Sequence, residues 1–322
     1  MGGDFFECVD VGSENCPCYL SLTNDCMTCT RLQGMDHCDC KWAGVCIYNE
    51  FIWNKKEIKN PRNDIKVEIV DKKIYDNQFA VLVFKTDKYL SQRFKYPGTY
   101  IFMRNPNDSF IYDVPISVMY ADSDKDHVHT AIKIISAKTK RLIDSEDNLI
   151  IRGPYRNGIF GLSHLKNITN GRMLILCKSM GIAPAVKIMK YYDKNLKMDL
   201  IADINRIPSS FAQDCLVDCK ADINYLNFKN EYDLDTIKSL INEKKYDAVA
   251  VFATDKYISL FHNILKSINY DKGFITVNNF SMCCGEGVCG ACASTTKDGK
   301  VVKMCKCQMK GEDVLKGGVI HV

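Results

Sequence analysis

Four cysteines near the C-terminus constrain this chain more than any other feature of its sequence. They follow the spacing C-x4-C-x2-C-x12-C with glycines between the first three, and they are Cys284, Cys289, Cys292 and Cys305. A [2Fe–2S] cluster takes its thiolates at such a spacing, three from one loop and the fourth from a distance. Glycine lets that loop turn with positive φ and approach the cluster closely. The pattern therefore predicts a [2Fe–2S] cluster on these thiolates, with a hairpin turn at 297–300 ahead of the fourth.

Two other interpretations of these cysteines stay open. A structural zinc ion usually takes two short C-x2–4-C pairs separated by a longer gap, which this spacing matches less well. The cysteines could also be buried free thiols. Cys283 and Cys307 flank the set, and either could replace one of the four ligands.

The composition is that of an ordinary soluble protein with two or three domains. The chain has 322 residues, of which 46% are hydrophobic and 25% charged, and its net charge is +4. So small a charge without a basic block argues against a nucleic-acid surface, and no apolar run is long enough to span a membrane. The N-terminus lacks the pattern of a secretory signal. The 17 cysteines therefore indicate metal ligation in a reducing cytoplasm rather than disulfides.

Residues 1–60 form a cysteine-rich module. So short a segment has few apolar residues for a core, and such segments usually depend on a metal or on disulfides. Its paired cysteines are enough for one [4Fe–4S] cluster with further ligands, and a zinc site is the alternative. Cys8 stands apart and is expected to be a free thiol. The predicted ligands are Cys16, Cys18, Cys26, Cys29, Cys38, Cys40 and Cys46.

Residues 61–165 have the pattern of an antiparallel β-barrel. After a linker at 60–64, residues 65–70 alternate between apolar and polar, and 79–84 is a β-rich run. Turn residues separate about six short strands, as in a barrel of this size. The predicted strands are 65–70, 79–84, 100–103, 114–120, 129–135 and 148–152.

Strands and helices alternate through residues 166–275. Such alternation predicts a parallel sheet, which binds ligands at the carboxyl ends of its strands. The fold class is therefore multidomain, α+β and α/β: a barrel, a parallel-sheet domain resembling those that bind nucleotides, and a small cluster segment at 276–322. The predicted elements of the parallel domain are strands at 173–177, 198–202 and 248–252 and helices at 183–190, 235–242 and 256–268.

Five short motifs in the correct order make the chain resemble the ferredoxin-reductase superfamily from about Ile65 to Gln308. More narrowly, it is similar to the electron-transfer subunit of dihydroorotate dehydrogenase. Other similar proteins are the flavoprotein subunits of sulfide dehydrogenase and of NADH-dependent ferredoxin:NADP oxidoreductase. The segments that carry the resemblance are 96–101, 114–117, 131–133 together with the turn at 138–142, 153–160 and 180–185.

The resemblance implies an FAD site on the barrel and a nicotinamide-nucleotide site on the parallel domain. Hydroxyls at Ser117 and Thr139 and the charge of Lys133 suit a pyrophosphate. A helix starting near Ala183 offers its N-terminus to phosphate. The implied FAD residues are Val114, Pro115, Ile116, Ser117, Ala131, Ile132, Lys133, Lys138 and Thr139, and those for the nucleotide are Gly181, Ile182, Ala183 and Pro184.

The chain departs from the family pattern at three places. Val114 stands where the family has arginine, so Arg104 or Lys133 is expected to supply the missing charge. The family's Gly-Gly-x-Gly turn reads Lys-Ser-Met-Gly at 178–181, and its Cys-Gly-Pro reads Ala-Thr-Asp at 253–255. Side chains in the first turn obstruct close approach of a pyrophosphate, although Lys178 could contribute a charge to it.

The predicted function is that of an electron-transfer flavoprotein. NAD(P)H passes a hydride to FAD, which needs positioning rather than an acid–base residue, and electrons leave through the [2Fe–2S] cluster. The expected partner is a catalytic dehydrogenase or reductase subunit, or ferredoxin, in a hetero-oligomer within an anaerobic cytoplasm. One alternative is an FAD and iron–sulfur relay that no longer binds NAD(P)H. Another is a non-redox, zinc-containing assembly platform.

Overall fold

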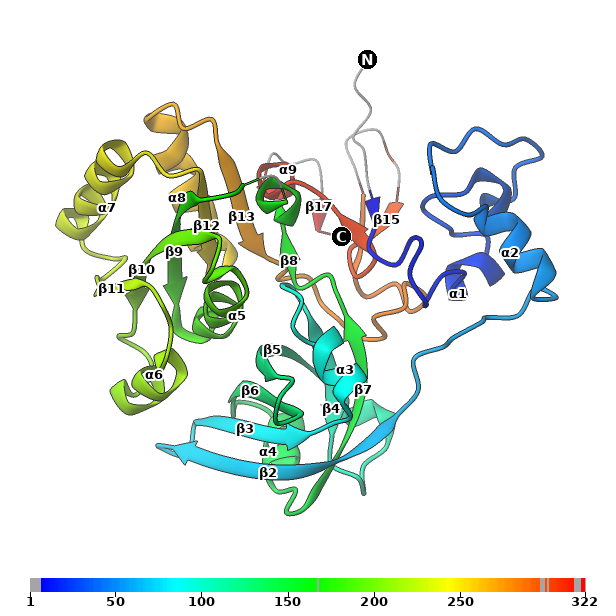
Figure 1. The fold of residues 1–322 in the computed structure, drawn as a ribbon, viewed down its shortest axis with the longest axis horizontal. Coiled ribbons are helices and arrows are strands. Elements are labelled where there is room, and N and C mark those ends of the chain that lie inside the picture. The colour runs from blue at the N-terminus through cyan, green and yellow to red at the C-terminus, as the bar shows by residue number, and fades with distance from the viewer. Residues whose placement is uncertain (1–6, 167, 296–298, 300, 316–319, 322) are drawn as a thin grey trace. The chain divides into compact units, whose positions relative to one another are not determined.

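The computed structural model describes residues 7–166, 168–295, 299, 301–315 and 320–321. The chain divides into two compact units (Figure 1). The terminal unit comprises Met1–Asn63, Phe280–Met309 and Asp313–Val322, and the central unit comprises Asp64–Asn279 and Lys310–Glu312. In the described part of the chain, no helix has the length and apolar character needed to cross a membrane.

Six strands of the central unit close into an antiparallel barrel, which confirms the predicted barrel. The strand order around it is β2-β3-β6-β5-β4-β7, and neighbouring strands pair antiparallel. The strands are β2 (Ile65–Tyr75), β3 (Phe79–Lys85), β4 (Tyr100–Arg104), β5 (Val114–Asp122), β6 (His127–Lys133) and β7 (Asn148–Tyr155).

The sequence of strand β3 is apolar without alternation because the strand is buried on both faces. Ala80, Leu82 and Phe84 are fully buried in the barrel core. Phe79 and Val81 point to the other face and join the core of the parallel-sheet domain. Successive side chains of a strand point to opposite faces, so a strand buried on both faces reads as one continuous apolar run.

Two short helices complete the barrel. Asp87 caps α3 (Lys88–Arg93) by accepting from the Leu90 N–H at 2.7 Å. Strand β6 ends at Lys133, two residues before the predicted end, and Ser136 then caps α4 (Ala137–Ile143) in a capping box with Thr139. The predicted turn at 138–142 is therefore wrong. These residues are helical, because the capping box starts a helix just before them.

The second domain of the central unit is a six-stranded sheet in the order β11-β10-β9-β12-β13-β8. It is parallel except at β8, which confirms the predicted parallel sheet. Its strands are β8 (Ile159–Phe160), β9 (Gly171–Lys178), β10 (Leu196–Asp203), β11 (Asp222–Tyr225), β12 (Ala248–Phe252) and β13 (Gly273–Val277).

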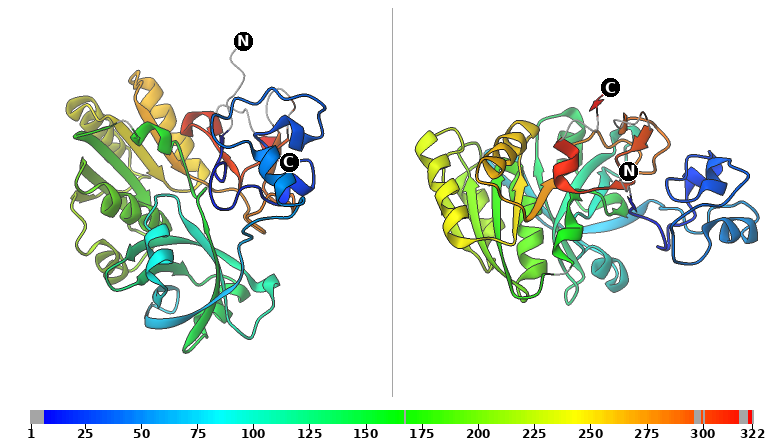
Figure 2. Two further views of the ribbon diagram at one scale, coloured as in Figure 1. Left: turned by 45° about the vertical axis from the view of Figure 1, so that its right-hand side comes forward. Right: turned by 90° about the horizontal axis from the view of Figure 1, so that it is seen from above.

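Helices cover both faces of this sheet (Figure 2). Ile175 of β9 packs in one core with α5 and α6, whereas its neighbours Leu174 and Leu176 are buried on the opposite face. Helix α6 and strands β8, β11 and β13 were not predicted, because their sequences are short or lack a clear period. The helices are α5 (Ile182–Tyr192), α6 (Ser209–Leu216), α7 (Glu231–Lys244) and α8 (Asp255–Ser267).

The barrel and the parallel-sheet domain share one core within the central unit. Phe79 of β3 stacks at 5.3 Å from Phe211 of α6. The carboxylate of Asp214 on α6 accepts hydrogen bonds from Lys73 and Tyr75 of β2, each at 2.5 Å. These contacts lie between the domains, so the barrel is not an independent body.

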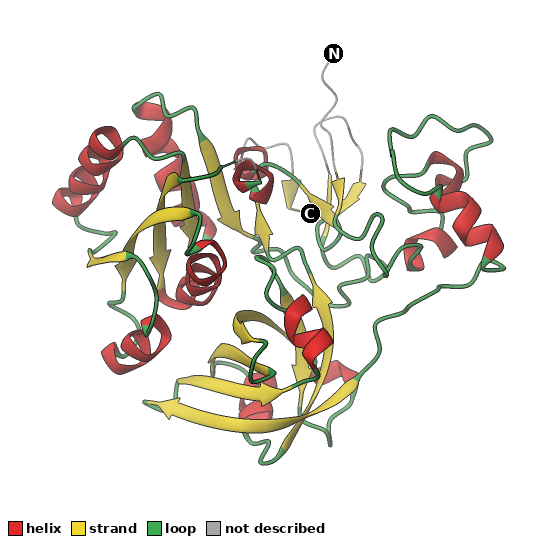
Figure 3. Cartoon of the chain, in the orientation of Figure 1, coloured by secondary structure: helices red, strands yellow, loops and turns green. Residues whose placement is uncertain are grey.

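The terminal unit joins the two ends of the chain through short elements. β1 (Glu7–Cys8) pairs antiparallel with β16 (Cys307–Gln308). A three-stranded sheet contains β15 (Val301–Lys303), β14 (Ala293–Thr295) and β17 (Ile320–His321). Most of the predicted turn at 297–300 lies outside the described residues. Figure 3 shows that loops predominate around α1 (Tyr19–Leu22) and α2 (Ile47–Trp53). The remaining short helices are η1 (Thr30–Gln33), η2 (Phe110–Tyr112), η3 (Leu162–Leu165), η4 (Ser179–Gly181) and α9 (Gly311–Leu315).

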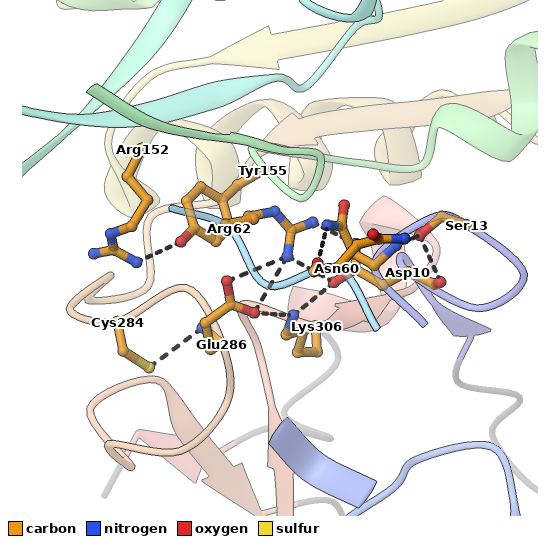
Figure 4. Close-up of polar contacts among 10 residues, drawn as sticks. Asp10, Ser13, Asn60, Arg62, Arg152, Tyr155, Cys284, Glu286 and Lys306 are labelled. Atoms are coloured by element: carbon orange, nitrogen blue, oxygen red, sulfur yellow. Dashed lines mark hydrogen bonds and ion pairs between the residues drawn. The ribbon is translucent and has the colours of Figure 1, made fainter. Parts of the chain in front are cut away.

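A buried cluster of four charges holds the two ends of the chain together (Figure 4). Lys306 Nζ lies 2.6 Å from Asp10 and 2.7 Å from Glu286. Arg62 approaches the same carboxylates at 2.7 and 3.2 Å, and no side chain of the four is more than 9% exposed. Burial by itself would raise the pKa of Asp10, but the two cations lower it to about 2. Every charge of this four-charge cluster is therefore compensated locally.

We expect Lys306→Met to lower the free energy of unfolding by about 3 to 5 kcal/mol, because removing one member leaves buried charge without its counterion. Lys310→Met removes a nearby exposed lysine and should cost no more than about 0.5 kcal/mol. Chemical denaturation of both variants measures the difference. Equal stability of the two would contradict a structural role for the four-charge cluster.

Candidate functional site

The loop before β14 carries three of the four C-terminal cysteines. Gly285, Gly287 and Gly290 have φ of 73°, 81° and 79°, values that side chains rarely allow. The hairpin of β14 and β15 then returns Cys305, whose N–H donates to the Cys292 sulfur at 3.4 Å. The loop folds as the sequence predicted, with glycines at its reversals and a distant fourth cysteine brought back by a hairpin.

The four C-terminal thiols lie next to one another. Cys305 and Cys289 are close enough to the Cys284 sulfur to shift its pKa, and Cys284 and Cys292 shift that of Cys305. The hydrogen bond from Cys305, against the opposing effect of burial, lowers the pKa of Cys284 to about 4. The thiolate is the form that binds metal. The four residues therefore fit a small iron–sulfur cluster in donor chemistry and in proximity.

As they stand, the described residues include no group of three or more His, Cys, Asp or Glu side chains in a metal-ligating arrangement. The fit to a cluster thus rests on thiol proximity and loop geometry. The flanking cysteines differ from the four: Cys283 is exposed, and Cys307 is buried in β16. Burial raises the pKa of Cys307 to about 12, which disfavours its thiolate.

The predicted N-terminal ligands separate into two groups. Cys29, Cys38, Cys40 and Cys46 line one pocket. Cys16, Cys18 and Cys26 do not line it, and they influence one another electrostatically. Cys26 also lies next to the pocket, since its sulfur accepts a hydrogen bond from the Cys29 N–H at 3.5 Å. The structure therefore does not gather all seven around a single point.

The predicted FAD residues lie on β5, on β6 and at the start of α4. Val114 and Ser117 on β5 lie opposite Met103 and Tyr100 of β4. Lys138 Nζ donates to the Asp113 carbonyl oxygen at 3.3 Å, which brings α4 next to the start of β5. The nine residues come from this one region of the barrel: Val114, Pro115, Ile116, Ser117, Ala131, Ile132, Lys133, Lys138 and Thr139.

Besides Lys138, two more of these side chains have partners inside the protein. The Thr139 hydroxyl accepts from the N–H groups of Ile135 and Ser136, both at 3.0 Å, within the helix cap. The Lys133 ammonium lies 5.8 Å from the centre of the Phe79 ring. Ser117 and Val114 are half-buried, and Pro115 is exposed.

Two arginines lie beside Val114, where the family pattern has one. Arg104 and Arg152 each bind the buried Asp113 carboxylate at 2.8 Å. Arg152 stands on β7, in the row that passes through Phe102 of β4 to Pro115 of β5. Sequence reasoning had considered Arg104 but missed Arg152, although it immediately precedes the motif at 153–160.

Aromatic rings surround Arg152. Its guanidinium lies 4.8 Å from the centre of the Phe102 ring and donates to the Tyr155 hydroxyl at 2.5 Å (Figure 4). Tyr155 in turn stacks on Tyr100 at 5.2 Å. All three rings are buried, so they fix the position of the guanidinium and keep its positive charge next to the start of β5.

The predicted nucleotide loop lies between β9 and β12, where the strand order of the sheet reverses. In open α/β sheets, ligands bind at such a point. A Cβ on Gly181 would lie 1.8 Å from the carbonyl oxygen of Phe252, so only glycine fits there. Ile182, Ala183 and Pro184 follow as the buried first turn of α5.

Lys178 is not available to a phosphate in this structure. It lies directly opposite Asp203 across β9 and β10 and forms a salt bridge with it. Burial alone would raise the pKa of Asp203, but hydrogen bonds from Lys178 and from backbone N–H groups lower it. The ring centre of Tyr257 lies 5.0 Å from the Lys178 ammonium. The ion pair and this ring together occupy the space at the carboxyl ends of β9 and β10.

Two substitutions in the nucleotide loop should act in opposite directions. Gly181→Ala should lower the free energy of unfolding by about 3 kcal/mol, because the new methyl group would overlap the Phe252 carbonyl. Ser179→Gly should raise it by up to about 1 kcal/mol, because Ser179 has φ of 53°, which glycine adopts without strain. Thermal unfolding of both variants tests the two signs.

The stability that Asp203 provides should depend on pH. Its folded pKa is lowered, so the contribution is present above its unfolded pKa of about 3.9 and is lost as the pH falls through the folded value. Asp203→Asn should cost about 3 kcal/mol near neutral pH. Denaturation at neutral and acid pH should show this difference shrinking in acid. A difference that stays constant would contradict the ionised pair.

Comparison with known proteins gave structural matches only. No protein-family model matches the sequence, and no curated protein matches it. A chain from the structure of NADH-dependent reduced ferredoxin–NADP oxidoreductase, described for flavin-based electron bifurcation, matches with a TM-score of 0.59 and 17% identity over 77% of this chain and 88% of that chain.

Phthalate dioxygenase reductase, described as a modular structure for electron transfer from pyridine nucleotides to [2Fe–2S], matches with a TM-score of 0.52 and 12% identity. The match covers 77% of this chain and 96% of that chain. Both matches include the barrel followed by a parallel sheet that sequence and structure show here. The chain therefore shares the fold of these two reductases.

Proposed function

We propose that this protein is an electron-transfer flavoprotein subunit that passes electrons between NAD(P)H and a partner protein. The observation that carries the proposal is the proximity of the thiols of Cys284, Cys289, Cys292 and Cys305 in a chain with a reductase fold. FAD would be held by the barrel and a [2Fe–2S] cluster by these thiolates.

When bound, FAD takes up two electrons as a hydride and releases them singly, which suits a one-electron cluster as the next carrier. The residues of the chain bind and orient. Segment 114–117 would hold the flavin, with the Ser117 hydroxyl as a hydrogen-bond donor. Arg152, supported by Asp113, supplies the positive charge that Val114 lacks. Tyr100 and Tyr155, whose stacked rings are buried, would exclude water from the flavin site.

The nicotinamide nucleotide would bind at residues 181–184, at the reversal point of the sheet. The printed descriptions of both similar structures name pyridine nucleotides or NADH. The N-terminus of α5 and Gly181, where only glycine fits, support this assignment.

A second function has an observation in its favour. Serine replaces a family glycine at 179, and the salt bridge of Lys178 with Asp203 closes part of the strand ends. Both features favour an FAD and iron–sulfur relay that takes its electrons from a protein rather than from NAD(P)H. In either case, we propose a catalytic dehydrogenase or reductase subunit, or ferredoxin, as the partner in a hetero-oligomer.

The experiment is an absorbance measurement on protein purified without oxygen. We expect flavin bands, an iron–sulfur shoulder and about two sulfide ions per chain from this site. Bleaching by NADH or NADPH would support the first function, whereas bleaching only by reduced ferredoxin or dithionite would support the relay. A colourless preparation with zinc but without flavin or sulfide would rule out both.

Replacing one cluster ligand should separate the two cofactors. Cys292→Ser should abolish the EPR signal of the reduced [2Fe–2S] cluster and leave bound FAD at its normal stoichiometry, because the flavin residues lie on the barrel. Cys219→Ser removes a cysteine of the central unit and should change neither signal. Retention of the EPR signal in Cys292→Ser would contradict the ligand assignment.

A further inference from the structure

A pocket in the N-terminal module collects half of the cysteines found there. It has a volume of about 310 Å³ and lies wholly within the terminal unit. Four of its ten lining residues are cysteines: Cys29, Cys38, Cys40 and Cys46. No segment of the central unit lines it, so the N-terminal module alone builds this pocket.

Short elements on two sides position these cysteines. Cys29 immediately precedes η1, and Cys46 immediately precedes α2. Cys29 is only 3% exposed, so it is fixed in the small core of the module. Cys38 and Cys46 are exposed at the pocket's mouth. Cys29 is therefore fixed in the core of the module, whereas Cys38 and Cys46 lie on the solvent side of the pocket.

Hydrogen bonds hold the loop that carries Cys38 and Cys40 against η1. The Thr30 hydroxyl donates to the His37 carbonyl at 3.2 Å and accepts from the Asp39 N–H at 3.3 Å. Arg31 donates to the Asp36 carbonyl. These contacts keep both thiols on the same side as Cys29.

A second set of contacts shapes the approach to Cys46. The Trp42 indole N–H donates to the Val45 carbonyl at 2.9 Å and closes a tight turn. A Cβ on Gly44 would lie 2.2 Å from the indole ring, so the ring covers this glycine directly. The turn thereby places Cys46 at the start of α2, facing the same pocket as the other three.

The module has too small an apolar core to explain its fold alone. One buried cluster contains Cys29, Leu32, Ile47 and Phe51. Segments with so little buried apolar surface usually need a metal, because binding energy then replaces core energy. The four pocket cysteines are suitably placed to provide it.

The lining of the pocket suits an iron–sulfur cluster, because four thiols are the ligands that a cluster of four iron and four sulfide ions takes. Such a cluster on four thiolates is also an anion, and Arg31 lines the same pocket, with its guanidinium 5.0 Å from the Tyr48 ring centre.

We propose that Cys29, Cys38, Cys40 and Cys46 hold a [4Fe–4S] cluster in this pocket. The assignment divides the seven predicted N-terminal ligands, leaving Cys16, Cys18 and Cys26 outside the site. It does not depend on flavin or nucleotide binding, so it can fail or succeed separately from the proposed function.

The test uses the full chain, purified without oxygen and reconstituted with ferrous iron and sulfide. Cys38→Ser and Cys46→Ser alter exposed side chains and are expected to leave the protein folded. Each should lower iron and sulfide by about four per chain and remove the [4Fe–4S] EPR signal of the reduced protein. The [2Fe–2S] signal should persist in both variants, which shows that the rest of the terminal unit is intact.

Cys16→Ser is the matched control, because Cys16 belongs to the same module but not to the pocket. It should retain the [4Fe–4S] signal at full intensity. Loss of the signal in Cys16→Ser together with its retention in Cys46→Ser would overturn the assignment. Stoichiometric zinc without extra sulfide after purification would overturn it as well. If flavin is absent while the [4Fe–4S] signal follows this pattern, only the proposed function fails.

Discussion

The four-charge cluster of Asp10, Arg62, Glu286 and Lys306 is the interaction on which the terminal unit depends. Burying an ion is costly unless its partner is buried with it, so these residues stabilise the fold only as a complete set. Glu286 belongs to the cysteine loop, and Lys306 directly follows Cys305. The same network therefore fixes the loop and its returning strand, and it ties both to the N-terminal module through Asp10.

The central unit depends instead on apolar packing shared by two domains. Strand β3 contributes one face to the barrel core and the other to the parallel-sheet domain. Helix α5 starts at the proposed nucleotide loop and packs along β5, so its position is determined from both sides. Its Lys187 is fully buried and donates to the Phe94 carbonyl, and burial lowers the pKa of this lysine to about 7. A fixed distance between the two proposed cofactor sites follows from this shared core.

The proposed redox sites lie where the chain departs from regular structure. The C-terminal cysteines stand on a loop of left-handed glycines, and the N-terminal ones lie in loops between short helices. Loops can bring several thiols to one place because their backbone does not have to form the regular hydrogen bonds of a helix or sheet. Such loops are less stable than helices and strands. The four-charge cluster stabilises the C-terminal loop, and we propose that bound iron and sulfide stabilise both sites.

The sequence alone determined the barrel, the parallel sheet and the C-terminal cysteine set, because strand alternation, buried runs and ligand spacing are local signals. It could not reveal that Asp10 binds Lys306, that Lys178 binds Asp203, or that Arg152 binds Asp113. These pairs are 25 to 296 residues apart, and charged residues leave no periodic trace. Sequence analysis also missed α6 and β13. Their sequence patterns are short, and packing against neighbouring elements stabilises them. Only tertiary packing decided which of the N-terminal cysteines share a pocket, since spacing along a loop does not specify where the loop folds back.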